Sequence, residues 1–297
     1  MLHWPYIHFN KTGHHRPAKS IMPTMSTMPF TTIETSLENH IAHVRLNRPD
    51  KVNAMNAPMW SEIRTAMKWA DETPEVRVVI ISGNGKNFSA GIDLGMMMAL
   101  GKQIEDACEA RMRENLRNVI LDLQDCLTAI ERCRKPVIAA IQGACIGGAV
   151  DLISCCDMRY ASNDATFSIK EIDIGMTADV GTLQRLPKII HPAMVRELAF
   201  TGRNVRADEA EKIGLVNRLF DSPASLDAGV AEIAKTIAEK SPLSIRGVKE
   251  MLNYARDHSV ADGLNYVATW NAAMLMSADL QEAMMANMDK RKPEFRD

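Results

Sequence analysis

The stretch KPVIAAIQGACIGGAVDL, residues 135–152, decides the fold. Its apolar run at 136–141 is short and uniformly hydrophobic, which predicts a buried strand. A glycine-rich loop follows at 143–148, and residues 149–156 begin a helix. Glycine lets a backbone approach a ligand closely, and the free N–H groups at the start of a helix stabilise negative charge. The stretch therefore predicts a strand, a loop and a helix that present main-chain donors.

A second segment has the same character. FSAGIDL at 88–94 follows an apolar strand predicted at 76–82. Two N–H groups that converge on one oxygen form an oxyanion hole, in which losing one donor costs about 10²–10³ in rate. Taken singly, each segment is more typical of a tight turn between a strand and a helix. No dinucleotide-binding G-x-G-x-x-G follows a first strand, and Gly147-Gly148 lacks the Lys-Ser/Thr of a P-loop.

The periodicity of the flanking sequence predicts a recurring strand, strand, helix order. Such an order indicates an α/β fold built as a coiled stack of β-β-α units, with helices alone after Pro223. The predicted division is a leader at 1–28, a core at 29–223 and a helical region at 224–297. The predicted strands are 31–35, 41–46, 76–82, 136–141, 158–161 and 166–168, and the predicted helices are 58–71, 103–132, 149–156, 226–240, 242–256, 261–275 and 278–290.

Composition limits the functions that need to be considered. The 297 residues are 46% hydrophobic and 24% charged with a net charge of −2, which does not favour binding to nucleic acid or to a membrane surface. No run of 18 uncharged apolar residues predicts a membrane span. The six cysteines have no zinc-ligand spacing, so we expect reduced, buried thiols. We expect a cytoplasmic protein, or a mitochondrial matrix protein if residues 1–28 are a transit segment.

Four ordered motifs carry a resemblance to a known family. They are NRPDKVNAMN at 47–56, SGNGKNFSAGIDL at 82–94, KPVIAAIQGACIGGAVDL at 135–152 and EIDIGMTADVGTLQRLPKII at 171–190. Together they resemble the crotonase, or enoyl-CoA hydratase/isomerase, superfamily from about Phe30 to the C-terminus. The resemblance implies a crotonase-like spiral of ββα repeats with a helical C-terminal trimerisation region. It also implies a homotrimer or homohexamer.

The same resemblance implies how an acyl-CoA thioester is held. The N–H groups of Ile92 and Gly148 would bind the thioester oxygen. The segment formed by Ala90, Gly91, Ile92, Asp93 and Leu94 would line the acyl-CoA path. The loop that contains Lys51 and Ala54 would lie near the CoA nucleotide. No metal or redox cofactor is implied, because CoA enters as part of the substrate.

Three carboxylates decide which reaction of the superfamily is expected. Hydratases of this superfamily carry Glu at the positions of Asp151 and Glu171, whereas the acidic trio of Asp151, Glu171 and Asp179 resembles the dienoyl-CoA isomerases. The implied reaction converts 3,5-dienoyl-CoA to 2,4-dienoyl-CoA in fatty acid β-oxidation. Glu171 would abstract the proton at C2, Asp179 would serve the distal carbon, and Asp151 would orient the pair. The roles of Glu171 and Asp179 are interchangeable at this point.

Each acid also has a structural alternative. Asp151 would complement a helix dipole, Glu171 would pair with Lys170 or Arg185 at the surface, and Asp179 would cap a helix at 180–186. Two other functions stay open: a 2-enoyl-CoA hydratase, and a non-catalytic member that binds RNA or acts as a scaffold. The preferred acyl chain length is not readable from the residues.

Overall fold

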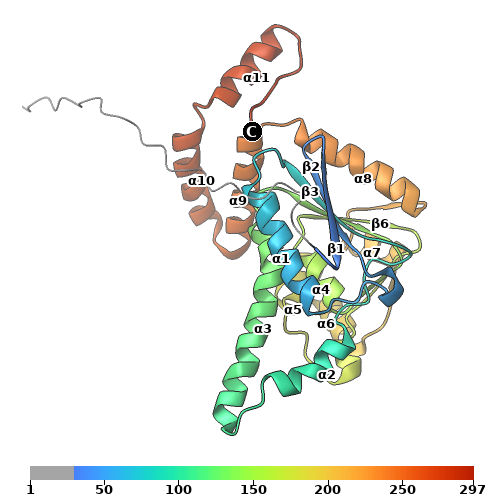
Figure 1. Ribbon diagram of the computed structural model, residues 1–297. Coiled ribbons are helices and arrows are strands. Elements are labelled where there is room, and N and C mark those ends of the chain that lie inside the picture. Colours follow the sequence, from blue (N-terminus) through green and yellow to red (C-terminus); the bar gives the residue numbers. More distant parts are fainter. Residues whose placement is uncertain (1–29) are drawn as a thin grey trace, which may run out of the picture.

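The computed structural model describes residues 30–297 (Figure 1), so the leader predicted at 1–28 lies outside the described residues. The main sheet has the strand order β1-β2-β3-β4-β6-β9. β1 and β2, at the strands predicted for 31–35 and 41–46, pair antiparallel as a hairpin, and the remaining neighbours pair in parallel. Its strands are β1 (Ile33–Glu38), β2 (Ile41–Leu46), β3 (Val78–Gly83), β4 (Val137–Ile141), β6 (Met158–Ser162) and β9 (Arg218–Phe220).

A smaller sheet contains β5 (Ala144–Ile146), β7 (Thr166–Ser168) and β8 (Val205–Arg206). Consecutive strands alternate between the two sheets: β4 and β6 lie in the larger one, and β5 and β7 in the smaller one. β5 is followed by helix α4 (Gly148–Ser154), so the predicted strand, strand, helix unit is present. The glycine-rich stretch therefore crosses from one sheet to the other immediately before it enters a helix.

The two faces of the main sheet carry separate apolar clusters. Val79 and Ile81 of β3 face the larger cluster, which includes buried residues of α1 (Ala57–Glu72), α3 (Glu109–Arg132) and α4. Val78 and Ile80 face the opposite cluster, which is completed by α8 (Pro223–Ala238). This alternation, with both faces covered, explains why β3 and β4 are continuous hydrophobic runs.

The C-terminal helices divide into two groups. α8 packs on the sheet beside β6 and β9, although the predicted division grouped it with the residues after 224. α9 (Pro242–Asp257), α10 (Val260–Met274) and α11 (Ala278–Met288) extend away from the sheet (Figure 1). Among the described residues, no helix combines the length and the apolar character needed to cross a membrane.

Several short elements were not predicted. They lack long periodic patterns, and α2 in addition contains two glycines and buries none of its residues. They are α2 (Leu94–Gln103), α5 (Thr182–Arg185), α6 (Pro192–Thr201), α7 (Ala207–Lys212), β5, β8, β9 and the 3₁₀ turns η2 (Pro49–Lys51), η3 (Glu171–Ile174) and η4 (Leu186–Lys188). β5 lies within residues 143–148, which the sequence predicted as a loop.

Candidate active site

Two loops bring the N–H groups of Ile92 and Gly148 together. The Met55 N–H donates to the Gly91 carbonyl at 2.7 Å, and the Asp93 N–H donates to the Met55 carbonyl at 3.0 Å, so both neighbours of Ile92 are tied to one residue. The buried Ser89 accepts from the Ile146 N–H through its carbonyl at 3.1 Å, which joins this loop to the glycine-rich stretch. Within residues 30–297, neither the Ile92 nor the Gly148 N–H has a hydrogen-bond acceptor.

Glycine at position 91 permits the close approach of the two loops. Its φ of +83° lies in the left-handed region, and a Cβ there would stand 2.4 Å from the Ile146 carbonyl oxygen and 3.0 Å from the Gly148 nitrogen. A Cβ built on Gly148 would stand 3.6 Å from the Ile92 nitrogen. Two unpaired donors on adjoining loops, one of them at the start of α4, form a candidate oxyanion hole.

Substituting Gly91 by Ala should therefore separate the two donors. We expect Gly91→Ala to lower kcat by about 10²–10³, the cost of losing one oxyanion donor. Gly101→Ala is the matched control, because a Cβ at that glycine of α2 meets nothing within 4 Å. Steady-state kinetics of both variants, with circular dichroism to verify folding, measures the difference. Equal kcat values in two folded variants would contradict the proposed role of the loop.

A cavity of about 400 Å³ opens beside the two donors. It gathers seven of the eight predicted substrate-binding residues, together with Glu171: Lys51, Ala54, Ala90, Ile92, Asp93, Leu94 and Gly148. Gly91, the eighth, acts through its backbone as described above. Asp93 has a structural role as well, since it caps α2 by accepting from the Gly95 N–H at 2.9 Å and pairs with Arg48 at 2.9 Å.

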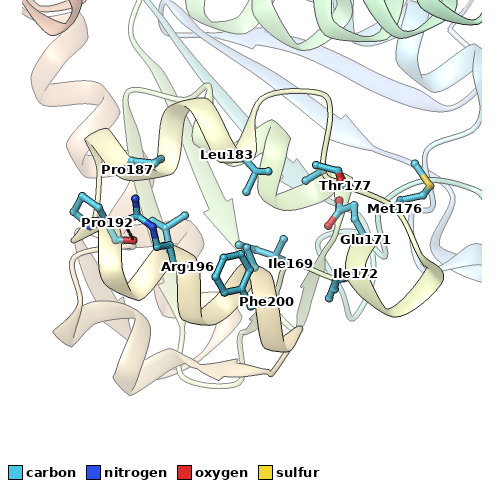
Figure 2. Close-up of a pocket in the computed structure, with 13 residues that line it drawn as sticks. Ile169, Glu171, Ile172, Met176, Thr177, Leu183, Pro187, Pro192, Arg196 and Phe200 are labelled. Carbon is cyan, nitrogen blue, oxygen red and sulfur yellow. Dashed lines mark hydrogen bonds between the residues drawn. The ribbon is translucent and has the colours of Figure 1, made fainter.

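A second cavity, of about 300 Å³, is mainly apolar. Its lining includes Ile169, Leu183 and Phe200, and Figure 2 shows Glu171 at one end and Arg196 near the other. Glu171 lines both cavities. The carboxyl group therefore lies between a cavity that contains the two N–H donors and a mainly apolar cavity.

The Glu171 carboxyl is close to the two donors and has a raised pKa. A Cβ built on Gly147 would lie 3.3 Å from Glu171 Oε1, which places the carboxyl group over the peptide that precedes α4. Burial, with the negative charge of Asp151 adding to it, raises the pKa of Glu171 to about 7. A carboxylate with a pKa near neutrality is suited to accept and return a proton.

Asp151, the second of the three acids, is completely buried. Its Oδ1 accepts from the Thr182 N–H at 2.6 Å, and among the described residues its Oδ2 has no hydrogen-bond partner. Burial raises the pKa of Asp151 to about 6. This acid therefore ties α4 to the start of α5, and its negative charge helps to raise the pKa of Glu171.

Asp179 is placed differently from the other two acids. It lines a third, polar cavity of about 420 Å³ with Gln124, Thr128 and Arg185, and it lines neither cavity that contains Glu171. Its charge nevertheless contributes to the raised pKa of Glu171. Burial raises the pKa of Asp179 itself above its usual range. The charges of Asp151 and Asp179 therefore both act on Glu171, although Asp179 lines a separate cavity.

Comparison with known proteins supplies the family. Residues 36–297 match the family model described as enoyl-CoA hydratase/isomerase. The chain belongs to this family. A peroxisomal Δ(3,5)-Δ(2,4)-dienoyl-CoA isomerase from Arabidopsis thaliana is 49% identical over 264 residues, which cover 89% of this chain and 95% of that protein. A mitochondrial enzyme of the same name from Homo sapiens is 48% identical over 260 residues, covering 87% and 79% respectively.

The fold of the enoyl-CoA hydratase/isomerase family agrees with the observed architecture. The crystal structure of enoyl-CoA hydratase subunit I from Geobacillus kaustophilus HTA426 superposes with a TM-score of 0.79 at 32% identity, covering 90% of this chain and 98% of that chain. The predicted crotonase-like α/β fold is thereby confirmed, as is the resemblance to the dienoyl-CoA isomerases within the family.

For this family member, two of the structural alternatives do not match the contacts. Lys170 pairs with Asp173 at 2.8 Å, and Arg185 pairs with Glu131 at 2.7 Å, so neither base pairs with Glu171. α5 begins at Thr182 with Gly181 as its N-cap, so Asp179 does not cap it. The third alternative is compatible with the structure, because Asp151 lies in the first turn of α4.

Sequence reasoning missed the groups that hold these acids in the family fold. The Thr182 N–H donates to Asp151, which lies 31 positions earlier in the chain. The Gln124 side-chain amide donates to the Asp179 carbonyl at 2.6 Å, across 55 positions. No local pattern indicates such pairings. The spacing of Gln124, Thr128 and Glu131 at i, i+4 and i+7 on α3 was the available signal, because it places three polar groups on one helix face.

The buried position of Asp151 leads to a prediction about stability. Its pKa is raised in the folded protein, so protonation stabilises the fold, and this stabilisation is lost as pH rises from about 4 through about 6. As pH rises from about 4 to about 7.5, the wild type loses this stabilisation and Asp151→Asn does not. We therefore expect the difference in free energy of unfolding between the two proteins to change by about 2–3 kcal/mol in favour of Asp151→Asn. Urea unfolding at both pH values measures the change. The exposed Asp208→Asn serves as control, and a pH-independent difference for Asp151→Asn would contradict the prediction.

Proposed function

We propose that this enzyme converts 3,5-dienoyl-CoA to 2,4-dienoyl-CoA in fatty acid β-oxidation. The observation that carries the proposal is the position of Glu171, which lies beside two unpaired N–H donors at the junction of two cavities. The two isomerases that are nearly half identical to this chain support the same reaction. The larger cavity would hold the thioester end of the substrate, and the apolar cavity would hold its chain.

The reaction moves one proton and two double bonds. Glu171 takes the proton from C2, and the electrons of that C–H bond form a C2=C3 double bond through a dienolate. The developing charge on the thioester oxygen is stabilised by the Ile92 and Gly148 N–H groups. A proton delivered to C6, in our proposal by a protonated Asp179, completes the shift from 3,5 to 2,4. The proton held by Glu171 then leaves to solvent, and Asp179 takes one up from solvent, which returns both acids to their starting states. No oxidation or reduction occurs, so we propose that CoA, as part of the substrate, is sufficient.

Asp151 disfavours the hydratase alternative. Hydration requires two acids that act on one water, but Asp151 is fully buried and one of its oxygens is bound to the Thr182 N–H. Among the described residues its other oxygen has no hydrogen-bond partner, and the negative charge of Asp151 adds to the burial that raises the pKa of Glu171. We therefore propose Asp151 as the residue that orients the site and adjusts its charge.

The proposed function is tested by ultraviolet absorbance. Adding the purified protein to a 3,5-dienoyl-CoA is expected to produce the longer-wavelength band of the conjugated 2,4-dienoyl thioester. Crotonyl-CoA is the comparison substrate, and its hydration should be much slower. A folded protein that leaves the dienoyl-CoA unchanged, or that hydrates crotonyl-CoA with higher kcat/KM, would refute the proposal.

We propose that the protein assembles as a homotrimer or homohexamer through its C-terminal helices. Val260 and Leu264 of α10 are 81% and 64% exposed, and Leu252 of α9 is 67% exposed. Exposed apolar side chains on two helices that contact each other, as α9 and α10 do, are typical of a subunit interface. We expect light scattering after gel filtration to give three or six subunits in wild type and fewer in Leu264→Glu. A monomeric wild-type protein would contradict the proposed assembly.

The expected cytoplasmic location is not supported by the relatives. One carries a peroxisomal and the other a mitochondrial designation. We propose that the protein acts in one of these two compartments. Microscopy of the full chain fused to a fluorescent protein at either end, with markers for both organelles, tests this, and diffuse fluorescence for both fusions would oppose it.

A further inference from the structure

The polar cavity beside Asp179 is bounded by a network of ion pairs that joins three helices. Arg185 of α5 donates to Glu131 Oε2 of α3 at 2.7 Å, and Arg256 of α9 donates to Glu131 Oε1 at 3.0 Å. Both oxygens of one carboxylate are thus shared between two arginines. The side chains of Glu131 and Arg185 are only 19% and 15% exposed, so these pairs are screened less by solvent than surface pairs.

The network holds the segment that carries Asp179. Gln124, Thr128 and Glu131 lie on one face of α3 and each contacts this segment: Gln124 donates to the Asp179 carbonyl, and Thr128 and Glu131 accept from Arg185. The Arg185 guanidinium also covers Gly181, where a Cβ would lie 1.9 Å from Nη1. The residues between Asp179 and Arg185 are therefore fixed from the α3 side.

The opposite side of the same segment is fixed by Asp151, through the Thr182 N–H. Asp179 consequently stands between an anchor on α4 and an anchor on α3. Two polar anchors on a short loop reduce its freedom, and a displacement of about 1 Å in a reacting group costs up to about 10² in rate.

We propose that Glu131 is a positioning residue that links α9, in the helical C-terminal region, to the Asp179 segment of the active site. The inference rests on the proposed function. Burial alone would raise the pKa of Glu131, but hydrogen bonds from Arg256 and Arg185 bring it below its ordinary value, which keeps the carboxylate charged between them. Asn253 adds a further contact from α9, since its amide lies 3.4 Å from the Glu131 carbonyl.

The proposal is tested with Glu131→Gln, which keeps the shape and removes the charge. We expect kcat for the dienoyl-CoA to fall about 10-fold while KM stays within about 2-fold, because the thioester cavity is not part of the network. Glu114→Gln, at an exposed glutamate of the same helix, is the matched control and should retain wild-type kcat. A purely structural role of Glu131 would lower the amount of active enzyme, which active-site titration detects, rather than kcat per site.

The link to α9 is tested separately with Arg256→Gln. Arg256 is more exposed than Glu131, so its substitution is expected to disturb folding less and provides a test if Glu131→Gln does not fold. We expect a loss of kcat in this variant, and we expect the double variant to lose no more than Glu131→Gln alone, as coupled residues do. Wild-type kcat in folded Glu131→Gln and Arg256→Gln would overturn the inference. Because wild-type turnover of the dienoyl-CoA is measured in the same assay, that outcome is distinct from failure of the proposed function.

Discussion

Glu171→Gln is expected to lower kcat for 3,5-dienoyl-CoA by about 10³-fold, because a positioned proton-transfer group contributes about 10²–10⁴ in rate. Glutamine preserves the shape of the side chain at the junction of the two cavities but cannot accept the C2 proton. The wild-type enzyme should also show kcat/KM falling as pH drops below about 7, because the base must be ionised and burial raises the pKa of Glu171 to that value. Stopped-flow absorbance across pH 5–9 measures both effects.

Asp173→Asn is the matched control for Glu171→Gln. Asp173 lies in the same 3₁₀ turn, is exposed, and pairs with Lys170 rather than facing either cavity. We expect Asp173→Asn to keep kcat within about 2-fold of wild type and to retain the fall in kcat/KM below about pH 7. A folded Glu171→Gln enzyme with more than a tenth of wild-type kcat would exclude Glu171 as the base.

Asp179→Asn is expected to lower product formation by about 10²–10³-fold through a different step. If Asp179 delivers the proton to C6, this variant should still exchange the C2 hydrogen of the substrate with deuterated solvent, since Glu171 and the two N–H donors are intact. Mass spectrometry of recovered substrate measures the exchange. Loss of exchange in Asp179→Asn with retained exchange in Glu171→Gln would reverse the two roles. Near-normal product formation would remove Asp179 from the mechanism.

The sequence predicted those parts of the fold that have local signals. The buried strands β3 and β4 are continuous apolar runs, and α1 shows its buried Met59, Ile63 and Met67 at helical spacing. The short elements α6 and β9 have no comparable pattern, because tertiary contacts rather than periodicity fix them. Local sequence patterns therefore predicted the long elements of the core and did not predict the short elements that pack around it.

The candidate site was predicted to a similar extent. Ordered motifs indicated which loops carry Ile92, Gly148 and Glu171, and the structure places these residues around one cavity. The separate cavity of Asp179 could not be predicted, since it depends on α3 packing against a segment about 50 residues further along the chain. Contacts between distant segments leave no trace in a single sequence unless a known family supplies them.

The shared position of Glu171 between two chambers implies how the enzyme selects the bond that it changes. If the Ile92 and Gly148 N–H groups bind the thioester oxygen and Glu171 is the base, the base lies a fixed number of atoms from the carbonyl, so the position of the new double bonds would be set from the thioester end, whatever the length of the chain. Longer and shorter substrates should yield the same positional isomer and differ chiefly in affinity. The preferred chain length would then depend on the apolar cavity alone, and the residues that line this cavity could differ among relatives without changing the reaction.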